Sequence, residues 1–393
     1  MKTYPYLILP ILGILAISCQ SPSVKISADF DKGSIGKMTE TNSNHLTGST
    51  RHWLKRDGIG DQYYWFYFKA DQVKNKRVIF ELKDLKGVYR ETPHIVYTDY
   101  TEPVYSYDQK HWKRITNVKY DSSTYTFLFS ERFEEEPVWI AYAHPYSTSR
   151  LDELLEKVRT SEYAKISKLA RTKEKRDISL VHITDHEIPD EDKKNILILA
   201  LQHAGEDAGG FMAEGIIQFL LSENEEAVSA RTRFNYFIVP MMNPDGIFNG
   251  TSRYNMKMED LNNIWLDDDK KQPEVTGLKN WAESWQSAGN DIDLFIDIHN
   301  HTQFHQYNVF IFQDHELDSL VTIMDKYWPI RIWHSEFKGS SCSYFYGRDI
   351  PSGTIELSQS HLGDGKYLTI EDYLSFGKGT VQALNEFYPQ DNP

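Results

Sequence analysis

The sequence predicts an α/β domain, with a mixed, mostly parallel sheet covered by helices on both faces, preceded by an antiparallel β-sandwich. Residues 24–147 contain short runs of aromatic and β-branched residues separated by turn residues, a pattern typical of a sandwich. Residues 148–390 alternate helical periodicity with nearly continuous apolar runs, which indicates strands buried on both faces of a sheet. We therefore place the domain boundary between residues 147 and 148.

Length and composition allow two folded domains and limit the classes of partner. The chain has 393 residues, of which 40% are hydrophobic and 13% aromatic, enough for two packed cores. Its formal net charge of -14 repels phosphate backbones, so we expect no nucleic-acid partner. The two cysteines, Cys19 and Cys342, form neither a disulfide framework nor a cysteine-based zinc site. A bound metal would need histidine and carboxylate ligands.

The N-terminal segment predicts export. The apolar stretch 6–17 is too short to span a bilayer and has the length of a signal-peptide core. It ends in Ser18-Cys19, which resembles a bacterial lipoprotein signal in which residues 1–18 are removed and Cys19 is lipidated. A plain secretory signal is the alternative. We expect a periplasmic or cell-surface protein that touches the membrane only through this lipid.

The first domain is expected to consist of aromatic strands. Its tyrosines could form a sugar platform, but packing against the second domain is the commoner use, and no cluster of potential ligands stands out here. The strand-like segments are 63–70, 77–85, 125–131 and 138–146.

The second domain is expected to alternate helices and strands. Leu151, Leu154, Leu155 and Val158 have helical spacing, with Ser149 as the expected N-cap. A second amphipathic helix is predicted over 209–222. The predicted strands are 178–185, 195–203, 234–242, 294–301, 307–313 and 353–358.

Polar residues at the ends of these strands form a candidate site. In an open α/β sheet, ligands bind beyond the carboxyl ends of the strands, where His203 and Glu206 follow one strand and His299 ends another. Glu356 is a lone acid in an apolar strand, a costly placement unless it has a partner or a function. The pair His203 and Glu206 is weak support alone, but two histidines, a glutamate and a free carboxylate suit a hydrolytic zinc site.

Several ordered motifs resemble the zinc carboxypeptidases of the funnelin type, in particular the cytosolic-carboxypeptidase-like branch. Residues 202–222 resemble its His-Pro-Gly-Glu segment and following helix, and residues 260–265, "DLNNIW", lie where it has Asp-Leu-Asn-Arg-x-Trp. Residues 294–313 are similar to its Asp-Leu-His-Gly-His strand pair, and residues 234–254 to its Asn-Pro-Asp-Gly stretch. The aromatic first half resembles the small sandwich domain of that branch.

The resemblance implies a role for each matching residue. One Zn²⁺ would be bound by His203, Glu206 and His299. Glu356 would be the general base, and Arg253 would polarise the scissile carbonyl and stabilise the oxyanion.

The expected binding site for the substrate's terminal carboxylate departs from the family. Asn262 matches an asparagine that binds this carboxylate, but Asn263 replaces the arginine that normally grips it. Losing one charged hydrogen bond costs roughly 1.5–3 kcal/mol of recognition. Arg348, eight residues before Glu356, is a candidate replacement. By resemblance, Tyr346 or Tyr344 is a candidate to close over the substrate, and packing is an equal alternative for both.

Three functions follow from these residues. The first is an exported metallocarboxypeptidase that acts on peptides, including cell-wall peptides. The second is a zinc-dependent esterase or amidase on a non-peptide glycan or cell-wall substrate, for which Asn263 is the reason. The third is a non-catalytic binding protein, which the complete set of catalytic residues disfavours. The oligomeric state is not predicted.

Overall fold

The computed structural model describes residues 23–388 apart from 59, 191–192, 302–305 and 364. The predicted signal segment and the Cys19 lipidation site lie outside the described residues. No helix among the described residues is long and apolar enough to cross a bilayer.

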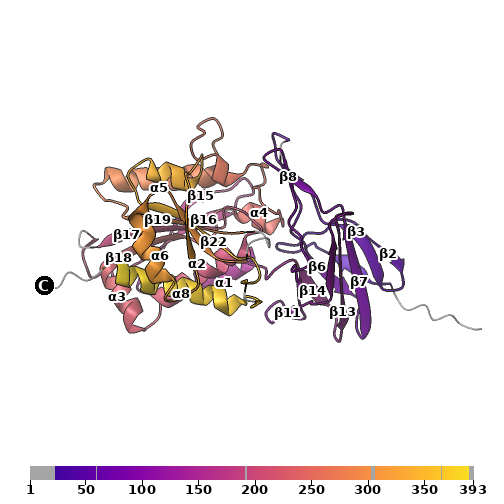
Figure 1. Ribbon diagram of the computed structural model, residues 1–393. Helices are drawn as coiled ribbons and strands as arrows, with labels where there is room; N and C mark the ends of the chain where they lie inside the picture. Colours follow the sequence, from indigo (N-terminus) through magenta and orange to yellow (C-terminus); the bar gives the residue numbers. More distant parts are fainter. Residues whose placement is uncertain (1–22, 59, 191–192, 302–305, 364, 389–393) are drawn as a thin grey trace, which may run out of the picture.

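The first domain is a β-sandwich, as predicted, and stands beside the second domain in Figure 1. Phe66, Phe80 and Phe129 stack between its two main sheets. All named strand pairs are antiparallel except β3–β7, which is parallel. One sheet has the order β1 (Lys25–Ser27), β6 (Tyr67–Asp71), β14 (Val138–Ala141), β10 (Val104–Ser106), β11 (Lys113–Arg114). The other has the order β12 (Val118–Asp121), β13 (Thr126–Phe133), β7 (Lys76–Lys83), β3 (His45–Ser49), β2 (Met38–Asn42).

A small third sheet of the first domain was not expected from the sequence. Its order is β4 (Trp53–Leu54), β5 (Asp61–Gln62), β8 (Gly87–Tyr89), β9 (Thr92–His94). Strands β8 and β9 form a hairpin with a two-residue turn, because Tyr89 pairs with Thr92. Both turn residues have positive φ, 48° at Arg90 and 64° at Glu91, which is the backbone of a tight type I′ hairpin turn. The turn places Arg90 at the tip of the hairpin.

The second domain is built on a mixed sheet, as predicted, and the sheet has eight strands, two more than the sequence predicted. Its four central strands are mutually parallel. The next strand on each side pairs antiparallel with them, and the outermost pair is antiparallel at one edge and parallel at the other. The order is β15 (Ala164–Arg171), β16 (Asp177–Ile183), β18 (Phe234–Val239), β17 (Lys194–Ala200), β19 (Leu294–Asn300), β22 (Ser352–Leu357), β20 (Val309–Phe312), β21 (Arg331–His334).

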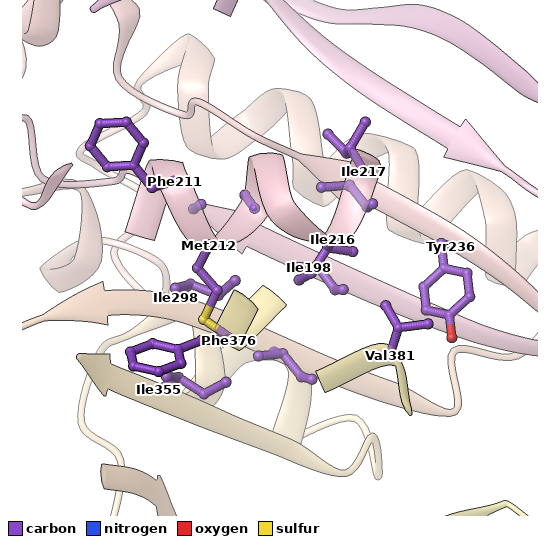
Figure 2. Close-up of a cluster of buried hydrophobic side chains, with 14 of the residues drawn as sticks. Ile198, Phe211, Met212, Ile216, Ile217, Tyr236, Ile298, Ile355, Phe376 and Val381 are labelled. Carbon is purple, nitrogen blue, oxygen red and sulfur yellow. The ribbon is translucent and has the colours of Figure 1, made fainter. Parts of the chain in front are cut away.

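Helices cover both faces of this sheet because successive residues of a buried strand point to opposite sides. Ile198 of β17 joins the core beneath α2 and α8, whereas Leu197 joins the core beneath α5 and α7. Figure 2 shows Met212 of α2 extending toward Ile298 and Ile355 of the sheet. The helices are α1 (Thr148–Arg159), α2 (Asp207–Leu220), α3 (Glu225–Arg233), α4 (Pro244–Phe248), α5 (Pro273–Ser287), α6 (Asp318–Met324), α7 (Ser341–Tyr346) and α8 (Ile370–Phe387).

The predicted N-cap of the first helix was wrong by two residues. The Ser147 side chain accepts a hydrogen bond from the Arg150 N–H at 3.2 Å, so α1 begins at Thr148 and Ser149 lies inside its first turn.

A buried ion pair ties the two domains together next to the candidate site. The Lys32 ammonium of the first domain lies 2.9 Å from the Asp207 carboxylate at the start of α2. The same ammonium donates to the Ala204 carbonyl at 2.6 Å and lies over the Trp65 ring. Both side chains of the ion pair are almost fully buried, with exposed fractions of 0% and 2%. The first domain is therefore anchored to the turn that carries His203 and Glu206.

Candidate metal centre

Three predicted ligands meet at the carboxyl edge of the central parallel strands. Strand β17 ends at Ala200, and the chain bends at Leu201, with φ 57°, to reach His203. Glu206 precedes α2, and His299 lies near the end of β19, which runs parallel to β17. The two histidines thus come from neighbouring strands although 96 residues separate them.

The donor atoms of these residues converge on one point. His203 Nδ1 lies 2.7 Å from Glu206 Oε1, and His299 Nδ1 lies 2.6 Å from Glu206 Oε2. The two Nδ1 atoms are 3.1 Å apart. All three side chains are buried. The structure brings together the three predicted ligands in an arrangement able to hold a metal ion.

Two further carboxylates orient the imidazole rings. Asp260 accepts a hydrogen bond from His203 Nε2 at 3.1 Å, and Asp297 accepts one from His299 Nε2 at 2.9 Å. With the Nε2–H groups used in this way, the Nδ1 lone pairs face the common point, as in metal sites with carboxylate-supported histidines. Sequence reasoning missed both acids. Asp260 opens the "DLNNIW" motif and Asp297 lies two residues before His299 on the same strand face, which are the signals that could have found them.

The donor set fits Zn²⁺. Two imidazole nitrogens and one carboxylate form the ligand set of many hydrolytic zinc sites, which keep a further position for water or substrate. Burial raises the pKa of Glu206, but the adjacent His203 and His299 outweigh it and hold that pKa below its usual range. Glu206 is therefore available as an anionic ligand.

Glu356 lies beside the ligands because of strand register. It pairs with His299 across β19 and β22, so the two side chains share one face of the sheet. Burial raises the pKa of Glu356 to about 7, with opposing contributions from His299 and Glu206. A carboxyl group that titrates near neutral pH can accept and return a proton during turnover.

Arg253 and the two asparagines surround Asp260. The Arg253 Nε donates to Asp260 Oδ2 at 2.7 Å, and its Nη1 lies 3.5 Å from Glu206 Oε1. The Asn263 amide donates to Asp260 Oδ2 at 2.7 Å, and the Asn262 Nδ2 lies 3.3 Å from His299 Nε2. Arg253 and Asn262 therefore lie next to candidate ligands, and Asn263 contacts the carboxylate that orients His203.

The two domains share the walls of the cavity above these residues, which has a volume of about 420 Å³. Sequence reasoning missed the contribution of the first domain. Tyr89 places its ring 5.0 Å from the Arg253 guanidinium, and no motif in the sequence marks this contact. The first-domain residues that line the cavity are Gln62, Tyr64, Tyr89, Arg90 and His94.

Two predicted substrate-binding residues do not line this cavity. The Arg348 guanidinium stacks on the Tyr344 ring at 3.5 Å and lies 3.8 Å from Glu283 of α5. The Tyr346 hydroxyl donates to the Asp314 carboxylate. Both side chains are committed to neighbours outside the cavity, so the structure corrects the prediction that Arg348 replaces the missing arginine, and it does not place Tyr346 over a substrate.

Comparisons with known proteins identify the family. A zinc carboxypeptidase family model matches residues 151–316, and a model of the cytosolic carboxypeptidase N-terminal domain matches residues 26–143. The chain is 28% identical over 294 residues to cytosolic carboxypeptidase 6 of Caenorhabditis elegans, covering 70% of this chain and 62% of the relative. It is 27% identical over 311 residues to the human protein of that name, covering 74% and 60%. The chain thus spans about 60% of the length of these relatives.

Solved structures share the fold over nearly the whole chain. A metallo-carboxypeptidase from Burkholderia cenocepacia aligns with a TM-score of 0.77 and 21% identity, covering 92% of this chain and 98% of the other. A metallo-carboxypeptidase from Pseudomonas aeruginosa aligns with a TM-score of 0.76 and 23% identity, with coverage of 92% and 98%. With both family models matching in order along the chain, and with a candidate zinc site where the motifs place it, this protein belongs to the zinc carboxypeptidase family.

Proposed function

We propose that this protein is a zinc-dependent metallocarboxypeptidase that hydrolyses the C-terminal peptide bond of its substrates. The observation that carries the proposal is the convergence of His203, Glu206 and His299 with Glu356 and Arg253 in one cavity. These are a metal-binding set, a proton acceptor and a fixed positive charge, which together suffice for amide hydrolysis.

Each residue has a defined task in this reaction. Zn²⁺ held by the three ligands would polarise the scissile carbonyl and acidify a water molecule. The Glu356 carboxylate accepts the proton of the attacking water and delivers it to the nitrogen of the departing residue. The Arg253 guanidinium stabilises the negative charge that develops on the carbonyl oxygen. Asn262 contributes hydrogen bonds to the terminal carboxylate of the substrate.

An esterase or amidase that acts on a non-peptide glycan or cell-wall substrate is the second candidate. Asn263 favours it, because an amide cannot supply the charge that an arginine offers to a terminal carboxylate. A non-catalytic binding protein has less support, since it has no need of Glu356 beside an intact ligand set.

Mass spectrometry of peptide mixtures tests these candidates. Zinc-loaded protein is incubated with peptides that carry either free or amidated C-termini, and Glu356→Gln serves as the control. Loss of single residues from free C-termini by the wild type alone supports the carboxypeptidase. No cleavage of any peptide, with zinc measured in the sample, contradicts it and favours a non-peptide ester or amide.

We also propose that the protein is exported and anchored through Cys19. The proposal rests on the N-terminal sequence alone, and the relatives described above are named cytosolic. It is tested by fractionating bacterial cells that express the full chain, with labelled palmitate added. Wild-type protein is expected in the membrane fraction with label, and Cys19→Ala without label. Unlabelled wild-type protein would rule out the lipid anchor.

A further inference from the structure

The cavity has an arginine beside position 263, and it comes from the other domain. The Arg90 Nη2 donates to Asn263 Oδ1 at 2.9 Å, and both residues line the cavity. We propose that Arg90 binds the C-terminal carboxylate of the substrate, in place of the arginine that the family motif carries at the position of Asn263. This inference rests on the proposed carboxypeptidase function and names its carboxylate receptor.

The hairpin that carries Arg90 is supported by neighbouring parts of the first domain. Its strand β8 pairs with β5 through Val88 and Asp61, and a Cβ on Gly87 would come within 2.3 Å of the Asp61 carbonyl oxygen. The Tyr63 hydroxyl donates to the His94 carbonyl at 3.1 Å, which fixes the end of the second strand of the hairpin. The hairpin thus presents the Arg90 guanidinium from a supported turn rather than from a free loop.

The charge of Arg90 is available to a ligand. Among the described residues, the Asn263 oxygen is its only hydrogen-bond acceptor, and no carboxylate within this part of the chain forms an ion pair with it. A guanidinium has five N–H donors in a planar fork, so most of them remain for a substrate carboxylate. Arg253, by contrast, is already engaged by Asp260 and Glu206. Of the two guanidinium groups among the described residues that line the cavity, Arg90 is the one free to bind an additional anion.

Lys338 is the rival for this role, because it is the other unpaired cation among the described residues that line the cavity. Two features favour Arg90. It contacts position 263 itself, and its planar fork can form two parallel hydrogen bonds with a carboxylate, which an ammonium cannot.

Binding to an inactive variant separates this inference from the proposed function. The zinc-loaded Glu356→Gln protein is titrated with one fluorescent peptide that ends in a free carboxylate and with the same peptide as a C-terminal amide. We expect tighter binding of the free acid. Adding Arg90→Ala should weaken binding of the acid about 10- to 100-fold and leave the amide unchanged, because one charged pair is lost.

Moving the charge provides the decisive comparison. Asn263→Arg in the Arg90→Ala background should restore the preference for the free acid, whereas Arg90→Lys should restore it only in part. Arg56→Ala removes a guanidinium of the first domain that lies outside the cavity and should leave the preference intact. Denaturant unfolding of each variant verifies that it is folded.

Two outcomes overturn the inference. One is that the preference for the free acid over the amide is unchanged in folded Arg90→Ala protein, or is already absent in the protein that retains Arg90. The other is a preference lost in Lys338→Ala and retained in Arg90→Ala, which would assign the carboxylate to the lysine. Neither outcome depends on turnover. If the enzyme is active but Arg90→Ala leaves binding unchanged, the role of Arg90 is wrong while the proposed carboxypeptidase function stands.

Discussion

The two walls of the cavity were built in different ways. In the wall from the second domain, the metal-binding set His203, Glu206 and His299 is buried at the ends of parallel strands, and each member is paired with an opposite charge or a ligand partner. The wall from the first domain includes an exposed hairpin tip whose arginine has no charged partner in the described part of the chain. The metal-binding set is thus held by buried, charge-compensated residues of the second domain, whereas the first domain adds an arginine that no charge compensates among the described residues.

The largest effect is expected from the proton acceptor of the rigid wall. Glu356→Gln keeps the shape of the side chain but removes its basicity, so we expect kcat to fall about 10²- to 10⁴-fold. Zinc content, measured by mass spectrometry, should stay at the wild-type level because Glu356 is not among the candidate ligands. An unchanged rate would show that another group accepts the proton.

The next effect concerns the buried ion pair between the two domains. Lys32→Met removes the ammonium and leaves the Asp207 carboxylate buried without its partner, so we expect a loss of about 3–5 kcal/mol in the free energy of unfolding. Urea unfolding provides the measurement. Lys86→Met, at an exposed lysine of the same domain, is the control and should lose much less. Equal losses in the two variants would mean that the buried pair contributes nothing specific.

A smaller effect is expected from removing the carboxylate that orients the ligand His299. Asp297→Asn replaces the carboxylate that accepts the His299 Nε2–H, so we expect zinc affinity to fall about 10- to 100-fold. Competition with a zinc chelator measures the affinity. Asp293→Asn changes an acid just before β19 that pairs with Lys194 far from the site, and serves as the control. Unchanged zinc affinity in Asp297→Asn would show that this carboxylate does not support the ligand.

The smallest effect concerns how the free energy of unfolding depends on pH through His94 in the first-domain wall. Burial, with Arg253 nearby, lowers the pKa of His94 to about 4, whereas histidine in an unfolded chain titrates near ~6.5. Between these values only the unfolded chain binds the proton, so stability falls as the pH drops from about 6.5 to about 4. We expect the free energy of unfolding, measured with urea on metal-free proteins, to fall less between pH 7 and pH 5 in His94→Gln than in wild type. Equal losses would exclude His94 as a source of the dependence.

The sequence by itself determined the elements and the reactive set. Periodicity predicted four strands of the sandwich, and two helices and six of the eight sheet strands of the second domain, because it reflects which face of each element must be buried. The motifs also placed His203, Glu206, His299 and Glu356 at strand ends, where parallel strands bring side chains together. Short-range patterns of this kind are readable without knowing how the domains pack.

Only the tertiary structure decided which residues line the cavity together. Arg90 and Asn263 are 173 residues apart and belong to different domains, so no local pattern connects them. Arg348 is close to Glu356 in sequence but stacks on Tyr344 instead, because the backbone after α7 directs its side chain toward α5. Proximity along the chain thus predicted a place for Arg348 in the site that packing does not give it. The contact between Arg90 and Asn263 instead arises because the first domain, anchored by the buried Lys32, packs against the second.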